Sequence, residues 1–250
     1  MKKTLNIAAL VLAFGILAGC EEKPAETPTT TTTSSGSAPQ ESTPASNQYD
    51  GNLANSQNDS SAPPAEAGSE VPQGTISVAN RKPKDGEEVA VLETEKGKIV
   101  LMFFPDKAPK HVANYKKLVK MGFYNGTKFH RTMPGFMIQG GDPNSKGSDR
   151  STWGSGGPDW SVKAEFNDVH HAKGVLSMAR SQDPDSAGSQ FFIMVADTAS
   201  LDHQYTAFGK VVKGQEVADA IVALPSEPGS GAAQQPVTLK KATLAKWPVK

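Results

Sequence analysis

The sequence predicts a mainly β domain, folded as a closed barrel or a sandwich, with two α-helices. Three observations support this fold class. Between residues 86 and 250, short apolar runs recur and are separated by Gly, Pro and Asp. Only two segments in that range carry apolar side chains at the spacing of a helix. The range spans about 165 residues, which suits one domain with a substantial core.

The first predicted elements are a β-hairpin and a helix. Residues 88–93 and 98–104 are alternately or continuously apolar on either side of Glu95-Lys96-Gly97, which is a turn sequence. Residues 108–120 then place apolar side chains at helical spacing, with Pro109 in the first turn and Gly122 after the end. Both elements follow from local pattern alone.

The run from Phe129 to Asp142 predicts two short strands around a Pro134-Gly135 turn. Because side chains alternate across a strand, Met137 and Gln139 are expected on one face and Phe136 and Ile138 on the other. The same alternation sends Phe191 and Phe192 to opposite faces of a later strand. Further strands are expected at residues 174–179, 190–195, 207–212 and 237–245, and the second helix at 215–224.

The first 19 residues predict a signal peptide. Lys2 and Lys3 precede an apolar run too short to span a bilayer, and Leu17-Ala18-Gly19-Cys20 supplies small residues at a cleavage point. The pattern resembles a bacterial lipoprotein signal, which implies lipid on Cys20, cleavage before it and an extracytoplasmic location anchored to a bacterial cell membrane. The alternative is an ordinary secretory signal with an incidental cysteine. Cys20 is the only cysteine, so disulfides and thiol catalysis are excluded in the remainder.

Residues 20–85 predict a lipidated N-terminus and a disordered tether. Their composition is dominated by Thr, Ser, Pro, Ala, Asn and Gln, and large apolar residues are almost absent, so no core can form. The single globular domain is therefore expected at residues 86–250.

Several function classes are disfavoured. The chain carries no net charge, which gives no sign of nucleic-acid binding. The five histidines show no metal-ligand spacing, so no metal is expected. A serine hydrolase is also disfavoured, because Gly188-Ser189-Gln190 lacks the second glycine of a nucleophile elbow and leads into a strand.

Six segments in order give the domain a specific resemblance to the cyclophilins, over residues 88–246. They are residues 103–109 (FFPDKAP), 122–127 (GFYNGT), 129–142 (FHRTMPGFMIQGGD), 174–179 (GVLSMA), 188–193 (GSQFFI) and 208–211 (FGKV). The resemblance implies an eight-stranded antiparallel barrel capped by two helices, and peptidyl-prolyl cis-trans isomerase activity without a cofactor. Its substrates would be proline-containing polypeptides, here unfolded or newly exported envelope proteins, and a monomer is expected.

Arg131 is the candidate catalytic residue. Rotation about an X-Pro bond loses amide resonance, and the proline nitrogen regains a lone pair that a directed, always charged donor can stabilise. The resemblance implies that Gln139 orients Arg131. It also implies that His130 packs in the site and contacts substrate without transferring protons. Without the resemblance, His130 is expected to be a hydrogen-bonded residue of the barrel. The resemblance further implies an apolar socket for the proline ring (Phe136, Met137, Phe192 and Leu201), a groove for the preceding residues (Ala179, Arg180 and Gln190) and a substrate contact at Tyr205.

Two positions depart from the family pattern. Ser200 stands where many cyclophilins carry a tryptophan, and Tyr205 stands where many carry a histidine. Loss of the indole opens one side of the proline pocket and removes a donor, so weak cyclosporin binding with retained isomerase activity is expected. The alternative function is a non-catalytic module or chaperone that binds proline segments. The presence of Arg131 and Gln139 favours catalysis, because binding alone would not offset the free-energy cost of burying a guanidinium.

Overall fold

The computed structural model describes residues 81–249. The predicted signal peptide, Cys20 and the tether up to residue 80 lie outside the described residues, and these predictions therefore stay predictions. No helix in the described range is long and apolar enough to cross a membrane.

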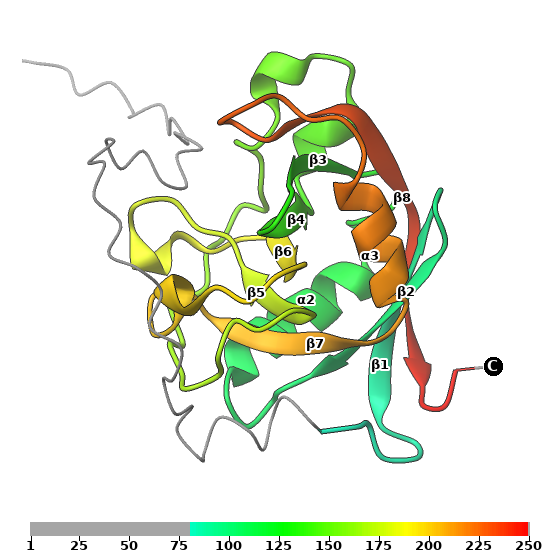
Figure 1. Ribbon diagram of the computed structural model, residues 1–250. Coiled ribbons are helices and arrows are strands. Elements are labelled where there is room, and N and C mark those ends of the chain that lie inside the picture. Colours follow the sequence, from blue (N-terminus) through cyan, green and yellow to red (C-terminus); the bar gives the residue numbers. More distant parts are fainter. Residues whose placement is uncertain (1–80, 250) are drawn as a thin grey trace, which may run out of the picture. The chain divides into compact units, whose positions relative to one another are not determined.

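Eight antiparallel strands close into a barrel in the order β1-β2-β7-β5-β6-β4-β3-β8 (Figure 1). This confirms the predicted barrel and excludes the sandwich. The strands are β1 (Glu88–Thr94), β2 (Lys98–Phe103), β3 (Lys128–Met133), β4 (Met137–Gly140), β5 (Val175–Met178), β6 (Phe191–Met194), β7 (Ala207–Lys213) and β8 (Ala232–Lys246).

Both predicted helices are present, as α2 (Pro109–Lys120) and α3 (Gln215–Val222). Helix α2 contacts β7 and β8, whereas α3 contacts β2, β3 and β4. Because α3 touches strands that are not neighbours in the barrel, it covers one opening of it. Four short 3₁₀ helices lie in the described connections: η1 (Pro143–Lys146), η2 (Arg150–Thr152), η3 (Pro184–Ser186) and η4 (Ala199–Leu201).

The N-terminus of α2 is capped from a distant segment. The preceding residue, Ala108, offers no side-chain hydrogen bond. Instead the Glu165 carboxylate accepts the backbone N–H groups of Lys110 (3.1 Å) and His111 (2.9 Å). A carboxylate at this end also interacts favourably with the helix dipole.

Alternating side chains along the strands separate two apolar clusters. The first contains residues of all eight strands together with both helices, so it fills the barrel interior; Tyr115, Phe129 and Phe191 are its large aromatic members. The second lies on the opposite faces and includes Phe192 and Met137. The predicted opposite orientation of Phe191 and Phe192 is thereby confirmed.

One orientation prediction was wrong. Phe136 does not share a face with Ile138, because it belongs to the turn between β3 and β4, where strand alternation does not apply. Ile138 lies in the interior cluster, whereas Phe136 packs with Met137 in the outer cluster.

Two ordered segments reach further than the ranges predicted from the sequence. Strand β8 begins at Ala232, five residues before the apolar run that predicted it, and pairs Ala232 with Arg131. Residues 81–85 contact the barrel, since Arg81 forms an ion pair with Glu87 (2.9 Å) and Pro83 is buried. The chain therefore joins the domain ahead of residue 86.

Candidate active site

A row of side chains across four neighbouring strands organises the site. Arg131 on β3 pairs with Gln139 on β4, which pairs with Phe192 on β6, and Phe192 pairs with Ser177 on β5. Residues directly opposite each other point to the same face of a sheet. The register therefore brings the predicted cation, amide and socket residue together on the outer face of the barrel.

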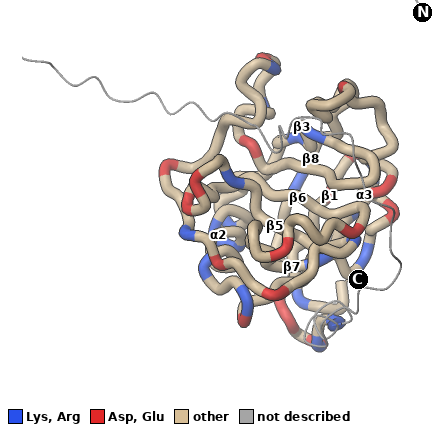
Figure 2. Tube along the Cα trace, turned by 60° about the vertical axis from the view of Figure 1, so that its left-hand side comes forward, with Lys and Arg blue, Asp and Glu red and all other residues tan. Residues whose placement is uncertain are grey.

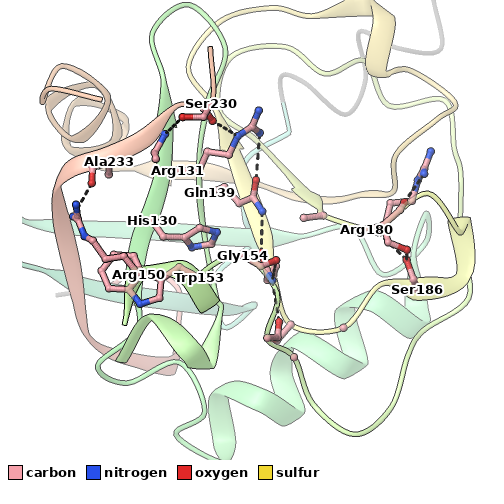
Figure 3. Close-up of a pocket in the computed structure, with 18 of the residues that line it drawn as sticks. His130, Arg131, Gln139, Arg150, Trp153, Gly154, Arg180, Ser186, Ser230 and Ala233 are labelled. Atoms are coloured by element: carbon pink, nitrogen blue, oxygen red, sulfur yellow. Dashed lines mark hydrogen bonds between the residues drawn. The ribbon is translucent and has the colours of Figure 1, made fainter. Parts of the chain in front are cut away.

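Arg131 is held by acceptors from two segments (Figure 3). Its Nε donates to the Ser230 carbonyl (2.9 Å), and its Nη1 donates to Gln139 Oε1 in a long hydrogen bond (3.5 Å). Burial lowers the pKa of Arg131, and the nearby Tyr205 opposes that shift. The guanidinium nevertheless stays charged, because its ordinary pKa is far above neutral pH.

A chain of amide hydrogen bonds fixes Gln139 in turn. Its Nε2 donates to Gln190 Oε1 (2.9 Å), and Gln190 Nε2 donates to the carbonyl oxygens of Gly154 (2.8 Å) and Gly156 (2.9 Å). Both glutamines are buried. Each amide can satisfy its partners in only one orientation, so the chain leaves Gln139 Oε1 turned toward Arg131.

The predicted socket residues lie together in the outer cluster. Met137 and Phe192 are each only 1% exposed, and Phe136, Leu201 and Tyr205 pack against them from the surface. The Tyr205 ring meets the edge of Phe192, with centroids 5.8 Å apart at 81°. Ala179 belongs to the same cluster. The structure thus gathers these side chains into one apolar wall beside Arg131.

Arg180 bridges two segments of the groove. Its guanidinium donates to the carbonyl oxygens of Ser181 (2.8 Å) and Gln204 (3.2 Å) and lies over the Tyr205 ring, 4.7 Å from the centroid. The resemblance placed Arg180 in the groove for the residues that precede proline. In this protein the side chain helps to fix Tyr205.

A buried histidine in a barrel is ordinarily hydrogen-bonded, and His130 departs from this expectation. The ring is 6% exposed, and neither nitrogen has a hydrogen-bond partner of normal geometry between residues 81 and 249. Burial lowers its pKa, while the Asp142 carboxylate and the Lys128 carbonyl oppose this shift. The ring borders the cavity described below.

Sequence reasoning missed a polar network behind Phe192. The His171 ring stacks on Phe192 (6.2 Å between centroids) and lies within hydrogen-bond distance of Ser177 Oγ (2.9 Å) and Asp202 Oδ1 (3.0 Å). This is the order of a serine hydrolase triad, but Ser177 is fully buried and cannot reach a substrate. Asp202 adjoins Leu201, so the network ties two sides of the apolar wall together. The pairing of β5 with β6 brings Ser177 beside Phe192, and no local motif signals the approach of His171 and Asp202.

A cavity of about 310 Å³ opens beside Arg131. It is lined by Gln139, Ala179, Arg180 and Gln190 from the predicted set, and by residues of the η2 loop and the start of β8 that the sequence did not single out, among them Arg150, Trp153, Ser230 and Ala233 (Figure 3). Phe136, Met137, Phe192, Leu201 and Tyr205 do not line it. The cavity and the apolar wall share Ala179 and otherwise consist of different residues next to the Arg131–Gln139 pair. Within the described chain, no group of three His, Cys, Asp or Glu residues could hold a metal ion.

Residues 89–244 match the family model described as cyclophilin type peptidyl-prolyl cis-trans isomerase. The chain belongs to the cyclophilin family. A probable peptidyl-prolyl cis-trans isomerase of Brucella abortus is 46% identical over 165 residues, covering 64% of this chain and 84% of the relative. Peptidyl-prolyl cis-trans isomerase A of Dickeya dadantii is 43% identical over 164 residues, covering 62% and 84%.

The fold also matches solved cyclophilins. A Cryptosporidium parvum cyclophilin type isomerase, crystallised in the presence of the dipeptide Ala-Pro, superposes with a TM-score of 0.57 at 29% identity, over 63% of this chain and 99% of that one. Cyclophilin AquaCyp293 of Hirschia baltica gives a TM-score of 0.54 at 29% identity, over 64% and 74%.

The two departures from the cyclophilin pattern lie at the edge of the apolar wall. Ser200 is exposed in η4, and its carbonyl accepts a hydrogen bond from Gln204 Nε2 (2.8 Å). Tyr205 is half-buried between Phe192 and Arg180. Burial raises the pKa of Tyr205, although Arg180 and Arg131 oppose the shift, so the phenol stays neutral and can donate a hydrogen bond.

Proposed function

We propose that this cyclophilin catalyses cis-trans isomerisation of X-Pro bonds with Arg131 as the catalytic residue. The observation that carries the proposal is the fixed guanidinium of Arg131, held by Ser230 and Gln139 beside the wall formed by Met137 and Phe192. The relatives named as isomerases, and the neighbour crystallised with Ala-Pro, support the same reaction.

The reaction breaks no covalent bond. The X-Pro amide must rotate through a twisted state against a barrier of about 18–20 kcal/mol, because resonance between nitrogen and carbonyl is lost. In that state the proline nitrogen is pyramidal and accepts a hydrogen bond. An N–H of Arg131 aimed at this nitrogen binds the twisted state more strongly than the planar one, which is the requirement for catalysis.

The neighbouring groups prepare Arg131 for this role. The Ser230 carbonyl and the Gln139–Gln190 chain restrict the guanidinium before substrate arrives, so little reorientation is needed in the twisted state. The apolar wall, with Phe136, Leu201 and Tyr205 at its surface, would hold the proline ring while the peptide on the other side of the bond turns.

The test compares Arg131→Ala and Arg131→Lys with the unchanged full chain. Cis-trans exchange of an X-Pro peptide is measured by exchange NMR, and peptide affinity is measured in parallel by titration. Loss of one fixed donor is expected to lower kcat/KM roughly 10²- to 10³-fold with little change in affinity. Lysine is expected to restore little, because its ammonium cannot occupy both acceptor sites.

Two outcomes would count against this assignment. A folded chain that binds proline peptides without accelerating exchange would be a binding module. A chain that accelerates exchange equally with and without Arg131 would be an isomerase of different mechanism.

We further propose that the protein is a lipid-anchored foldase acting on exported polypeptides outside the cytoplasm. The support is in the sequence: Lys2 and Lys3, the short apolar run and Leu17-Ala18-Gly19-Cys20. Uncatalysed X-Pro isomerisation takes tens to hundreds of seconds, so an anchored isomerase would shorten a slow folding step near the membrane. Metabolic labelling with palmitate tests the anchor: the unchanged chain should be labelled and Cys20→Ala should not.

A further inference from the structure

The cavity beside Arg131 has an unusual charge. Three arginines, Arg131, Arg150 and Arg180, line it, and no Asp or Glu of residues 81–249 does so. Along the trace in Figure 2, segments of Lys and Arg are interspersed with segments of Asp and Glu. The cavity is therefore a local region of positive potential in a chain without net charge.

Arg150 and Arg180 are positioned by neutral groups. Arg150 donates through Nη2 to the carbonyl oxygens of Ala233 (2.8 Å) and Gln234 (3.3 Å), and its guanidinium lies over the Trp153 ring, 5.1 Å from the centroid. Arg180 likewise binds carbonyl oxygens and an aromatic ring. The ion pairs found in the described chain include neither Arg150 nor Arg180. Carbonyl oxygens fix the geometry of a guanidinium but leave its charge in place.

The lining also contains a buried histidine, His130, whose ring nitrogens are available for hydrogen bonding. His130 is more than nine-tenths buried against the cavity, and both ring nitrogens lack a hydrogen-bond partner of normal geometry in the described chain. One carboxylate, Asp142, lies close enough to affect the pKa of His130, but it does not line the cavity. Its two oxygens already accept the backbone N–H groups of Asn144 and Gly154. Among residues 81–249, the cavity lining thus contains guanidinium donors and no carboxylate acceptor.

Size and chemistry together define the ligand. About 310 Å³ is at the lower end of ligand pockets, which suits one side chain of a bound polypeptide. A carboxylate complements guanidinium donors in charge and in geometry. We infer that this cavity makes the isomerase selective for polypeptides that carry an acidic side chain close to the isomerised proline.

This inference rests on the proposed function, because the cavity and the reaction share residues. Arg131 and Gln139 line the cavity and also face the X-Pro bond in the proposed mechanism. An acidic side chain that enters the cavity on the side of Arg150 or on the side of Arg180 therefore belongs to a residue near the proline in sequence. Arg150 and Arg180 would act as specificity-determining residues.

The experiment measures exchange in peptides of the form Ac-Ala-Ala-Ala-Pro-Ala-Ala-NH2, with each alanine replaced in turn by Glu, Gln or Lys. Blocked ends remove terminal charges that could enter the cavity, and exchange NMR needs no coupling protease. At one position or two adjacent positions, kcat/KM for Glu is expected to exceed that for Gln about 5- to 10-fold, and Lys is expected to fall below Gln. The Glu/Gln ratio should decline as salt is raised.

Variants of the full chain locate the preference. Arg150→Gln and Arg180→Gln should each lower the Glu/Gln ratio, whereas Arg150→Lys should keep much of it because the charge remains. Lys213→Gln is the matched control: it removes one positive charge from an exposed site at the end of β7, outside the cavity, and should leave the ratio unchanged. The ratio compares two peptides on one protein sample, so a partial loss of folded protein cancels.

The outcomes separate the two proposals. If no peptide is accelerated by the folded chain, the isomerase itself is refuted. If Glu and Gln peptides are accelerated equally at every position, isomerase activity stands and the acidic subsite is refuted. A Glu preference that survives both Arg150→Gln and Arg180→Gln would also overturn it, because the selectivity would then arise elsewhere.

Discussion

Substitution of Gly231 by alanine should impair the isomerase by releasing Arg131. Gly231 has φ of +70°, where a residue with a Cβ costs about 1–2 kcal/mol. The added Cβ would lie 2.5 Å from Met133 Cγ and 3.1 Å from the Thr132 carbonyl oxygen, so something must move. The loop is held there by the hydrogen bond from the Thr132 N–H to the Gly231 carbonyl (2.8 Å), which contributes about 1 kcal/mol.

The clash of the new Cβ with Met133 Cγ adds to the strain of the positive φ, so the loop should shift and carry the Ser230 carbonyl away from Arg131 Nε. A hydrogen bond to a charged group contributes about 1.5–3 kcal/mol, so kcat/KM is expected to fall about tenfold or more. Exchange NMR on an X-Pro peptide measures this loss, and urea unfolding measures stability. Ser230→Ala is the matched control, because it removes only the hydroxyl, which accepts the Ala232 N–H (3.2 Å), and keeps the backbone carbonyl that accepts from Arg131. Full activity in Gly231→Ala, or an equal loss in Ser230→Ala, would refute the reasoning.

Substitutions at Gln139, Glu165 and Ser200 test three other parts of the molecule. Gln139→Leu removes the partner of Arg131 and leaves the buried Gln190 Oε1 unpaired, so kcat/KM in the exchange assay should fall roughly tenfold; an unchanged rate would show that the amide chain is dispensable. Glu165→Ala removes the cap of α2 and the partner of His111, and should lower the free energy of unfolding in urea by about 3 kcal/mol; a loss below 1 kcal/mol would contradict the capping role. Ser200→Trp should raise cyclosporin affinity at least about tenfold by titration, since it restores an apolar wall and a donor; nanomolar binding by the unchanged chain would contradict this.

The elements of the barrel could be predicted because local pattern determines them. The alternation around Phe191 and Phe192 and the helical spacing before Gly122 placed their elements correctly. The alternation rule failed at Phe136, because a residue in a turn does not follow it. The family resemblance then supplied the strand number and the candidate site.

What could not be predicted depends on contacts between distant segments. Ser230, the backbone partner of Arg131, lies 99 residues further along the chain, in a loop whose sequence carries no motif. Arg150 and Trp153 reach the same cavity from η2. His171 contacts Phe192 and Asp202, which lie 21 and 31 residues further along the chain. Spacing along the sequence contains no information about these approaches, which are fixed by barrel closure.

The charges that serve the reaction and those that serve stability respond differently to acid. Arg131 keeps its charge despite the lowered pKa, so the proposed catalytic step has no titrating group near neutral pH. Glu165 is different: burial raises its pKa, but hydrogen bonds from His111 and from two backbone N–H groups outweigh that effect and lower it. Its stabilisation is therefore complete above the unfolded pKa of about 4.3 and is lost as the pH falls through the folded value.

Burial also lowers the pKa of His111 and His171 in the folded chain. Below about pH 6.5 these two histidines therefore bind more protons in the unfolded chain than in the folded chain. Acid should thus destabilise the barrel through groups away from Arg131. Activity per folded molecule should stay constant while the folded fraction declines. A catalytic histidine or carboxylate would instead change the rate before any unfolding, so the order of these two losses distinguishes an arginine-based isomerase from acid-base catalysis.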